Sequence, residues 1–159
     1  MQPPPSDIDF MQVALHEARL AGGEGEVPVG AVVVCDGRVV GRGRNACERL
    51  NDATAHAEMI AITAASQGLG TWRLEDCTLY VTLEPCPMCM GAGLNARVKR
   101  VVYGAFEPKA GACGSVVDLR APVGFNHAID TTSGVLGAES SELLKSFFRA
   151  LRERKRADG

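Results

Sequence analysis

Apolar residues in this chain recur first at helical and then at strand spacing. One face of an N-terminal helix is predicted by apolar positions at steps of three and four: Ile8, Met11, Leu15 and Ala18. Ser6 and Asp9 precede this face in the pattern of a capping box, which predicts where the helix begins. The pair Gly22-Gly23 predicts where it ends.

A β-hairpin is predicted next. Val27–Val34 is rich in β-branched residues, and Asp36-Gly37 is a strong two-residue turn signal. Arg38–Gly43 then returns as the second strand. The polar stretch Asn45–Thr54 has no periodicity and is predicted to be a loop.

The rest of the chain alternates between helical and strand patterns. In order, it predicts a helix over 56–66, a central strand over Cys77–Leu83, a helix over Pro87–Ala96, a strand over Lys99–Gly104, a weak strand over Ala128–Thr131 and a helix over Glu139–Arg154. Strand–helix–strand connections favour parallel neighbours, so we expect an α/β domain with a mixed sheet covered by helices. We expect a single domain over residues 1–159, with residues 1–6 as a flexible tail.

Composition and charge indicate the class of protein and its expected cellular location. The 159 residues are 46% hydrophobic, which suits a folded core, and the formal charge of −2 does not favour general binding to nucleic acid. There is no leader-like segment and no apolar run long enough to span a bilayer, so a cytoplasmic location is expected. The six cysteines are then expected to be reduced.

Two of these cysteines form a Cys-x-x-Cys motif within Glu84-Pro85-Cys86-Pro87-Met88-Cys89. Cys86 and Cys89 share one face of the helix that begins here, and Pro87 suits its first position. The positive end of that helix favours thiolates. Taken alone, the motif leaves metal binding, redox chemistry and a structural use open.

A histidine and a carboxylate change this interpretation. His56 and Glu58 lie at the start of the preceding helix, within Thr54-Ala55-His56-Ala57-Glu58. One imidazole and two thiolates are a catalytic zinc set that leaves a fourth position for water. Glu58 does not share a helix face with His56, so we expect it to carry protons rather than bind the metal.

The other cysteines have no motif around them; they are Cys35, Cys47, Cys77 and Cys113. Cys35 and Cys77 lie at strand ends and are expected to be small buried apolar residues. We therefore expect one Zn²⁺ per chain, held by His56, Cys86 and Cys89.

The pattern His-x-Glu followed by Pro-Cys-x-x-Cys is the signature of the zinc nucleobase deaminases. Beyond it, the chain resembles the bacterial tRNA-specific adenosine deaminases of the cytidine/deoxycytidylate deaminase superfamily over roughly residues 8–155. The segments that carry the resemblance are Glu26–Val32, Asn45, Thr54–Glu58, Tyr80–Cys86, the loop Gly104–Ser115 and Phe147–Arg149.

The resemblance implies a cytidine-deaminase-like, three-layer α/β/α fold with a mixed five-stranded sheet, and a homodimer. It implies hydrolytic conversion of adenosine to inosine at the wobble position of a tRNA anticodon stem-loop. It also implies that Asn45 hydrogen-bonds the flipped base, that Val29 lines the pocket and that Phe148 packs near the anticodon loop. Further substrate-binding residues are then Ala57, Glu107, Lys109 and Arg149.

The last helix carries a local basic stripe, made of Lys145, Arg149, Arg152, Arg154, Lys155 and Arg156. Such a stripe on a near-neutral chain suits a specific RNA loop, although it also suits a solvated helix end. The chain departs from the family pattern at Glu107, where aspartate is usual, at Ala53, where proline is common, and at Asn95, where a hydroxyl residue is common.

Two other hypotheses stay open. The same fold could deaminate a free base such as guanine, cytosine or a pterin-like ring. A zinc module without catalysis, which only binds RNA or protein, would also use the three ligands.

Overall fold

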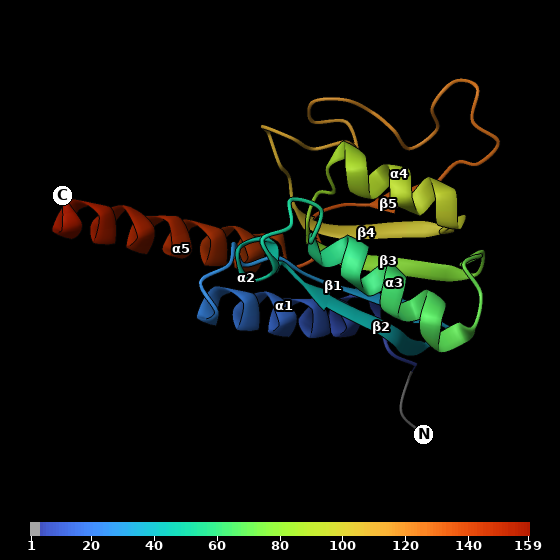
Figure 1. The fold of residues 1–159 in the computed structure, drawn as a ribbon. Helices are drawn as coiled ribbons and strands as arrows, with labels where there is room; N and C mark the ends of the chain where they lie inside the picture. Colours follow the sequence, from blue (N-terminus) through green and yellow to red (C-terminus); the bar gives the residue numbers. More distant parts are fainter. Residues whose placement is uncertain (1–3) are drawn as a thin grey trace.

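A five-stranded mixed sheet lies between two layers of helices in the computed structural model, which describes residues 4–159 (Figure 1). The elements in chain order are α1 (Asp7–Gly23), β1 (Gly30–Cys35), β2 (Arg38–Arg44), α2 (Cys47–Leu50), α3 (Ala57–Leu69), β3 (Cys77–Leu83), α4 (Pro87–Ala96), β4 (Arg100–Ala105), β5 (Asp130–Thr132) and α5 (Gly137–Asp158). The strand order is β2-β1-β3-β4-β5. β1 pairs antiparallel with β2 and β3, whereas β3, β4 and β5 are parallel. The predicted α/β class and mixed sheet are confirmed.

The two faces of the sheet are covered by different helices because strand side chains alternate in direction. Val33 and Leu79 belong to the core cluster beneath α3 and α4. Val32 and Tyr80, their neighbours along β1 and β3, belong to the cluster beneath α1. Figure 1 shows α3 and α4 on one side of the sheet and α1 and α5 on the other.

The start of α1 agrees with the predicted capping box. The side chain of Ser6 accepts the N–H of Asp9, and the N–H of Ser6 donates to the Asp9 carboxylate at 2.8 Å. Of the predicted tail, residues 1–3 lie outside the described range, and Ser6 is already part of this cap. The predicted apolar face is confirmed at Met11, Leu15 and Ala18, which are buried. It is wrong at Ile8, which is 52% exposed, because the buried face starts at Phe10.

The first strand begins at Gly30 rather than at Val27. Pro28 has no N–H to donate, and the N–H of Val29 bonds the carbonyl of Val27 at 2.8 Å in a tight turn. The remaining element bounds differ from the prediction by a few residues, with α5 extended at both ends to Gly137–Asp158.

The prediction of a loop over Asn45–Thr54 is wrong for Cys47–Leu50, which form the short helix α2. No side chain within α2 caps it. The buried carboxylate of Glu26 accepts the N–H groups of Glu48 and Arg49 at 2.9 and 2.7 Å. A residue more than twenty positions earlier therefore stabilises this helix, and no local pattern signals it.

The expectation of parallel neighbours is confirmed for β3 and β4 but is wrong for β2 and β3. β1 lies between β2 and β3, so the connection through α3 crosses a strand. Gly43 of β2 allows α3 to pack closely, since a Cβ on Gly43 would collide with the carbonyl oxygen of Ala57. This approach places the first turn of α3 against the sheet.

α5 extends past the sheet, and its C-terminal end projects away from the other elements (Figure 1). Its apolar residues Leu144, Phe147 and Leu151 are only half-buried, and Phe148 is 40% exposed. Within residues 4–159, none of the helices combines the length and the apolar character needed to cross a bilayer.

One ion pair ties the start of α1 to the sheet, and it yields a test of the fold. Asp7 accepts hydrogen bonds from Arg100 at 2.6 and 2.9 Å and from the hydroxyl of Tyr80 at 2.8 Å. The hydrogen bonds from Arg100 hold the pKa of Asp7 below its ordinary value of 3.8. A carboxyl group whose pKa is lowered by folding stabilises the fold above its unfolded pKa, and this contribution is lost as the pH falls through the folded pKa.

We therefore expect Asp7→Asn to lower the free energy of unfolding by about 1 kcal/mol near neutral pH, with a difference that shrinks as the pH falls below 3.8 and through the lowered pKa of Asp7. Urea unfolding at several pH values measures this. Glu75→Gln is the control, because its pair with Arg73 is exposed on both sides. A pH-independent difference would contradict the role given to the Asp7 carboxylate.

Candidate active site

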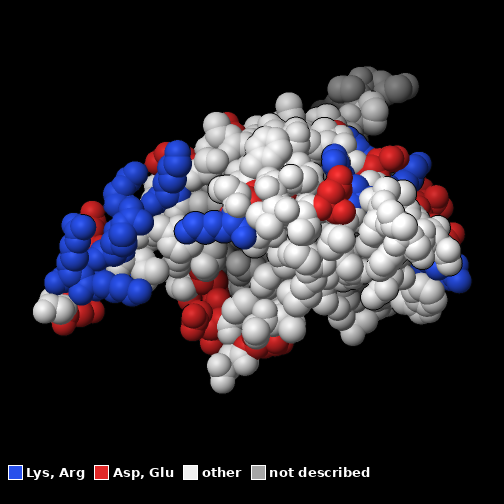
Figure 2. Space-filling model, turned by 90° about the horizontal axis from the view of Figure 1, so that it is seen from above, with Lys and Arg blue, Asp and Glu red and all other residues white. Residues whose placement is uncertain are grey.

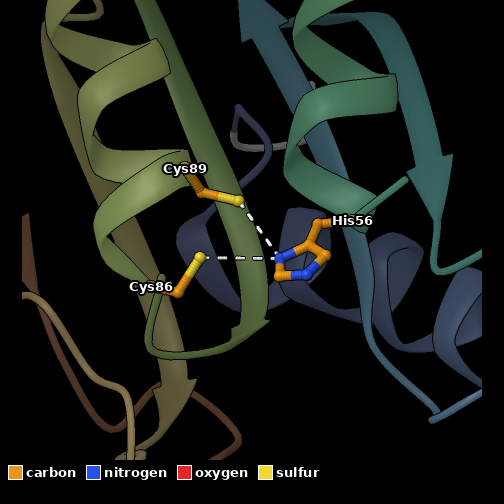
Figure 3. A group of neighbouring side chains, drawn as sticks. All are labelled: His56, Cys86 and Cys89. Atoms are coloured by element: carbon orange, nitrogen blue, oxygen red, sulfur yellow. Dashed lines mark hydrogen bonds between the residues drawn. The ribbon is translucent and has the colours of Figure 1, made fainter. Parts of the chain in front are cut away.

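The predicted zinc ligands come together where two helices begin. His56 is the N-cap residue of α3, and Cys86 is the N-cap residue of α4. Both have extended backbone conformations, with φ near −75° and −78°. Pro87 takes the first position of α4, as predicted, and Cys89 lies in the first turn. Figure 3 shows the two sulfur atoms facing the ring of His56 from the neighbouring helix.

The three side chains are spaced as zinc ligands. His56 Nδ1 lies 3.5 Å from Cys86 Sγ and 3.6 Å from Cys89 Sγ. Tetrahedral zinc, with bonds of about 2.0–2.1 Å to nitrogen and about 2.3 Å to sulfur, requires a nitrogen–sulfur separation of about 3.5 Å. All the ligand atoms lie within 4.8 Å of one another, and Glu58 does not belong to this group. The donors therefore fit a zinc ion without a fourth protein ligand.

The electrostatics of the pair of thiols also suit a cation. A hydrogen bond from Cys89, and a second from His56, lower the pKa of Cys86 to about 4. The same bond to Cys86, together with burial, raises the pKa of Cys89, so the two sulfurs share one proton. The bond to Cys86 raises the pKa of His56. A divalent cation would replace these protons, since metal ligands bind deprotonated.

Glu58 is the second residue of α3, beside the ligands but outside their group. Its side chain is only 4% exposed, and burial raises its pKa above the ordinary value of 4.5. Water is excluded from all but its edge, which faces a cavity. A carboxyl group with a raised pKa at such a place can both accept and return a proton near neutral pH.

This cavity has a volume of about 620 Å³. Its lining comes from six parts of the chain: Gly25, Glu26, Val27 and Val29; Asn45, Cys47 and Glu48; His56 and Glu58; Leu83, Glu84 and Cys86; Glu107 and Ala110; and Phe147, Phe148 and Leu151. Most of the exposed wall area is apolar, and five glutamates are among the polar residues that line it. A mainly apolar wall with polar groups set into it is typical of a site for a small molecule.

Most of the predicted site residues line the cavity, namely Val29, Asn45, His56, Glu58, Cys86, Glu107 and Phe148. Cys89 and Ala57 are buried behind its wall. Lys109 and Arg149 lie instead on an adjoining groove, which shares Glu107 and Phe148 with the cavity. Lys145 and Arg152 line this groove as well.

Basic side chains gather next to this groove. Figure 2 shows Lys and Arg crowded over the projecting end of α5, with acidic residues on other parts of the same face. The residues of the predicted basic stripe are all exposed. The cavity therefore has a locally positive surface beside its mouth, on a chain whose net charge is −2.

Asn45 has a structural role that the sequence did not reveal. Its Oδ1 accepts the N–H of Ala57 at 3.0 Å, and its Nδ2 donates to the carbonyl of Val27 at 3.2 Å. The amide thus connects the segment before β1 to the first residue of α3. One N–H and one lone pair of this amide remain for a ligand in the cavity.

Sequence reasoning missed two buried carboxylates, Glu26 and Glu84, that stabilise the cavity wall. Burial raises the pKa of Glu84, but hydrogen bonds from Ser115 and from backbone N–H groups outweigh it, so the net pKa is lowered. The only available signal was the position of each residue inside a family motif, Glu26 before Val27-Pro28 and Glu84 before Pro85-Cys86. Composition and periodicity gave neither residue a role.

Comparison with known proteins matches the site to a characterised group. The family model for the cytidine and deoxycytidylate deaminase zinc-binding region matches residues 4–105. The tRNA-specific adenosine deaminase of Bacillus subtilis (strain 168) is 49% identical over 148 residues, which are 93% of this chain and 92% of that protein.

Solved structures agree with this match. One, from a study of A-to-I editing by tRNA:A34 deaminases at the wobble position of transfer RNA, is 50% identical with a TM-score of 0.82 and covers 85% of this chain and 98% of its own. A guanine deaminase from Nitrosomonas europaea is 25% identical with a TM-score of 0.76, and the match covers 92% of this chain and 86% of that one.

The contribution of the two Asn45 hydrogen bonds to stability can be tested separately from catalysis. Asn45→Ala removes both hydrogen bonds and leaves the buried N–H of Ala57 without its acceptor. We expect the free energy of unfolding, measured by urea with zinc saturating, to fall by about 1–3 kcal/mol. Asn95→Ala is the control, because Asn95 is exposed on α4 and should show a change within about 0.5 kcal/mol. Equal stability of the two variants would show that the Asn45 bonds contribute nothing.

Proposed function

This chain belongs to the cytidine and deoxycytidylate deaminase family, and we propose that it deaminates adenosine to inosine at the wobble position of a tRNA anticodon. The observation that carries the proposal is the cavity itself. Three zinc-type ligands and a buried carboxylate lie at one wall, and a basic groove adjoins its mouth. The relative from Bacillus subtilis, matched over nearly the whole chain, supports the choice of substrate.

We propose that His56, Cys86 and Cys89 hold one Zn²⁺ per chain. When bound, this ion supplies a Lewis acid that lowers the pKa of a coordinated water toward neutrality. The protein contributes three donors, of which Cys89 is buried and His56 and Cys86 are half-buried, and no fourth ligand joins their group among the described residues.

Glu58 is proposed to move the protons. In the net reaction water adds to C6 of adenine, the C6–N6 bond breaks and ammonia leaves. The Glu58 carboxylate would take one proton from the attacking water and give it to N1 of the ring. It would then take the second proton from the new C6 hydroxyl and give it to the amine, so that ammonia leaves as the C6 carbonyl forms. The raised pKa of Glu58 suits a group that must be both base and acid.

The remaining residues are proposed to select the base and its RNA. Val29 packs against the ring, and the free N–H and lone pair of Asn45 bond its edge, while Ala57 fixes Asn45 from behind. A base can reach this cavity only after it leaves its stack, as expected for a flexible anticodon loop. Glu107, Lys109, Phe148 and Arg149 lie at the mouth and the groove, where the flanking nucleotides would pass.

The homodimer, the cytoplasmic location and the single-domain organisation stay predictions. The described residues form one sheet with helices on both faces, which supports a single domain.

The decisive experiment incubates the protein with an anticodon stem-loop that carries adenosine at the wobble position and sequences the RNA for inosine. We expect conversion by the natural chain, and a loss of rate of about a hundredfold to ten-thousandfold in Glu58→Gln, with zinc content unchanged. Deamination of free guanine or cytosine without conversion of the RNA would instead support the free-base alternative. Full activity in Glu58→Gln would contradict catalysis by this carboxylate, whereas RNA binding without conversion by the natural chain would support a binding module.

Metal analysis tests the ligand set. We expect close to one zinc per chain in the purified protein, loss of activity on chelation, and loss of most zinc in Cys86→Ser because only two donors remain. Cys35→Ser is the matched control and should keep its zinc, since Cys35 lies outside the ligand group. Two zinc ions per chain, or a fourth thiolate on the metal, would leave no open position for water.

A further inference from the structure

The buried carboxylate of Glu84 is bonded almost entirely to one loop. Glu84 follows directly after β3 and is 2% exposed. Its oxygens accept the backbone N–H of Glu107 at 3.0 Å, of Cys113 at 2.9 Å and of Ser115 at 3.2 Å. The hydroxyl of Ser115 donates a further hydrogen bond to it. Both oxygens are therefore occupied by protein donors from residues 107–115, which we call the clamp loop.

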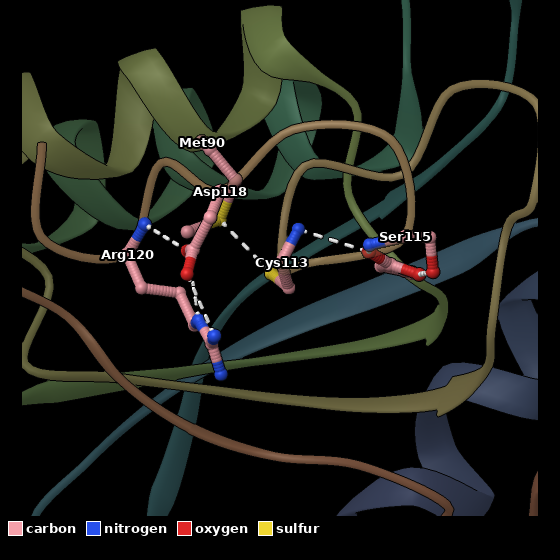
Figure 4. Close-up of polar contacts among 6 residues, drawn as sticks. Met90, Cys113, Ser115, Asp118 and Arg120 are labelled. Carbon is pink, nitrogen blue, oxygen red and sulfur yellow. Dashed lines mark hydrogen bonds and ion pairs between the residues drawn. The ribbon is translucent and has the colours of Figure 1, made fainter.

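The clamp loop folds tightly around this carboxylate. A Cβ on Gly111 would lie 2.5 Å from both carboxylate oxygens, so only glycine allows the approach. The N–H of Ala112 also donates to the carbonyl of Pro85 at 2.8 Å. Figure 4 shows Cys113 and Ser115 on adjacent parts of this loop, with their hydrogen bonds directed inward.

The clamp loop supplies part of the substrate path. Glu107 and Ala110 line the cavity, and Lys109 lines the adjoining groove. The Glu107 side chain in turn accepts the N–H of Lys109 at 2.9 Å. The backbone N–H of Glu107 donates to Glu84, so the position of the segment from Glu107 to Lys109 depends on the buried carboxylate.

We propose that Glu84 is a positioning residue for the RNA substrate, which holds the clamp loop so that Glu107 and Lys109 stand at the cavity mouth. This inference rests on the proposed function. Glu84 acts through the loop and not on the reacting atoms. A carboxylate suits this task because it only accepts hydrogen bonds, whereas a glutamine would turn an NH₂ group toward N–H donors.

The test uses Gly111→Ala, which keeps the Glu84 residue but sets a methyl group against its carboxylate and so separates the loop from it. We expect the Kd for an anticodon stem-loop, measured by fluorescence anisotropy on zinc-loaded protein, to rise by about tenfold or more, the size expected when hydrogen bonds to a charged group are lost. Zinc content and the Glu58-dependent reaction at saturating RNA should change much less. Amide hydrogen exchange at Glu107, Cys113 and Ser115 should become faster.

The paired variant Glu84→Ala identifies the cause. It should weaken RNA binding to a similar degree, and adding Gly111→Ala to it should cost little more, because the methyl group then fills the space of the missing carboxylate. Glu84→Gln should fail to restore binding. Additive effects of the two substitutions would show that Gly111 and Glu84 act separately, and the proposal would be wrong.

A matched control separates positioning from general stability. Glu17→Gln removes another buried carboxylate, one that pairs with Arg44 and lies away from the cavity. It should lower the melting temperature but leave the Kd for RNA unchanged. If Gly111→Ala and Glu84→Ala likewise lose only stability, or if Glu84→Ala loses zinc while Gly111→Ala binds RNA normally, Glu84 has no positioning role.

The outcome for the natural chain separates this inference from the proposed function. A natural chain that converts wobble adenosine while both clamp variants bind RNA normally overturns the positioning role alone. A natural chain that neither binds nor converts the stem-loop overturns the proposed function, and the positioning role with it.

Discussion

His56 Nδ1 lies about the same distance, 3.5 and 3.6 Å, from the two sulfurs of Cys86 and Cys89, and much of the molecule is arranged around this approach. The donors come from the first residues of two helices that follow different strands. They can meet only because α3 and α4 pack side by side on one face of the sheet. Gly43 lets α3 approach the sheet, and Pro87 begins α4 directly after Cys86. Without this packing, the same three residues would be an ordinary histidine and two thiols.

Three buried glutamates, Glu26, Glu58 and Glu84, line the cavity, and their hydrogen-bond partners differ. Glu26 satisfies the first N–H groups of α2, and Glu84 satisfies those of the clamp loop. Both are therefore carboxylates whose hydrogen bonds offset the cost of burial. Glu58 has no such set of backbone donors from another segment, and burial raises its pKa. The number of donors around each carboxyl group thus separates the proposed proton carrier from the two glutamates that accept backbone hydrogen bonds.

The sequence was informative where a residue acts through its neighbours in the chain. The spacing of Cys86 and Cys89, the capping pair Ser6 and Asp9, and the Asp36-Gly37 turn between β1 and β2 all depend on local geometry. It was uninformative where a distant residue supplies the partner. α2 depends on Glu26, and the loop after β4 depends on Glu84, so neither could be read from its own segment. The position of β1 between β2 and β3 in the strand order is likewise a property of the whole sheet.

The metal ligands and the walls of the cavity share their anchors. Ala57 follows His56 directly, and its N–H is held by Asn45, which lines the cavity. Glu84 stands two residues before Cys86 and holds the clamp loop. The anchors of both walls therefore lie within one or two peptide units of a proposed zinc ligand. Because interiors are close-packed, these anchors hold the ligands and the cavity walls in one arrangement. This arrangement favours a cavity that is already formed before the RNA arrives.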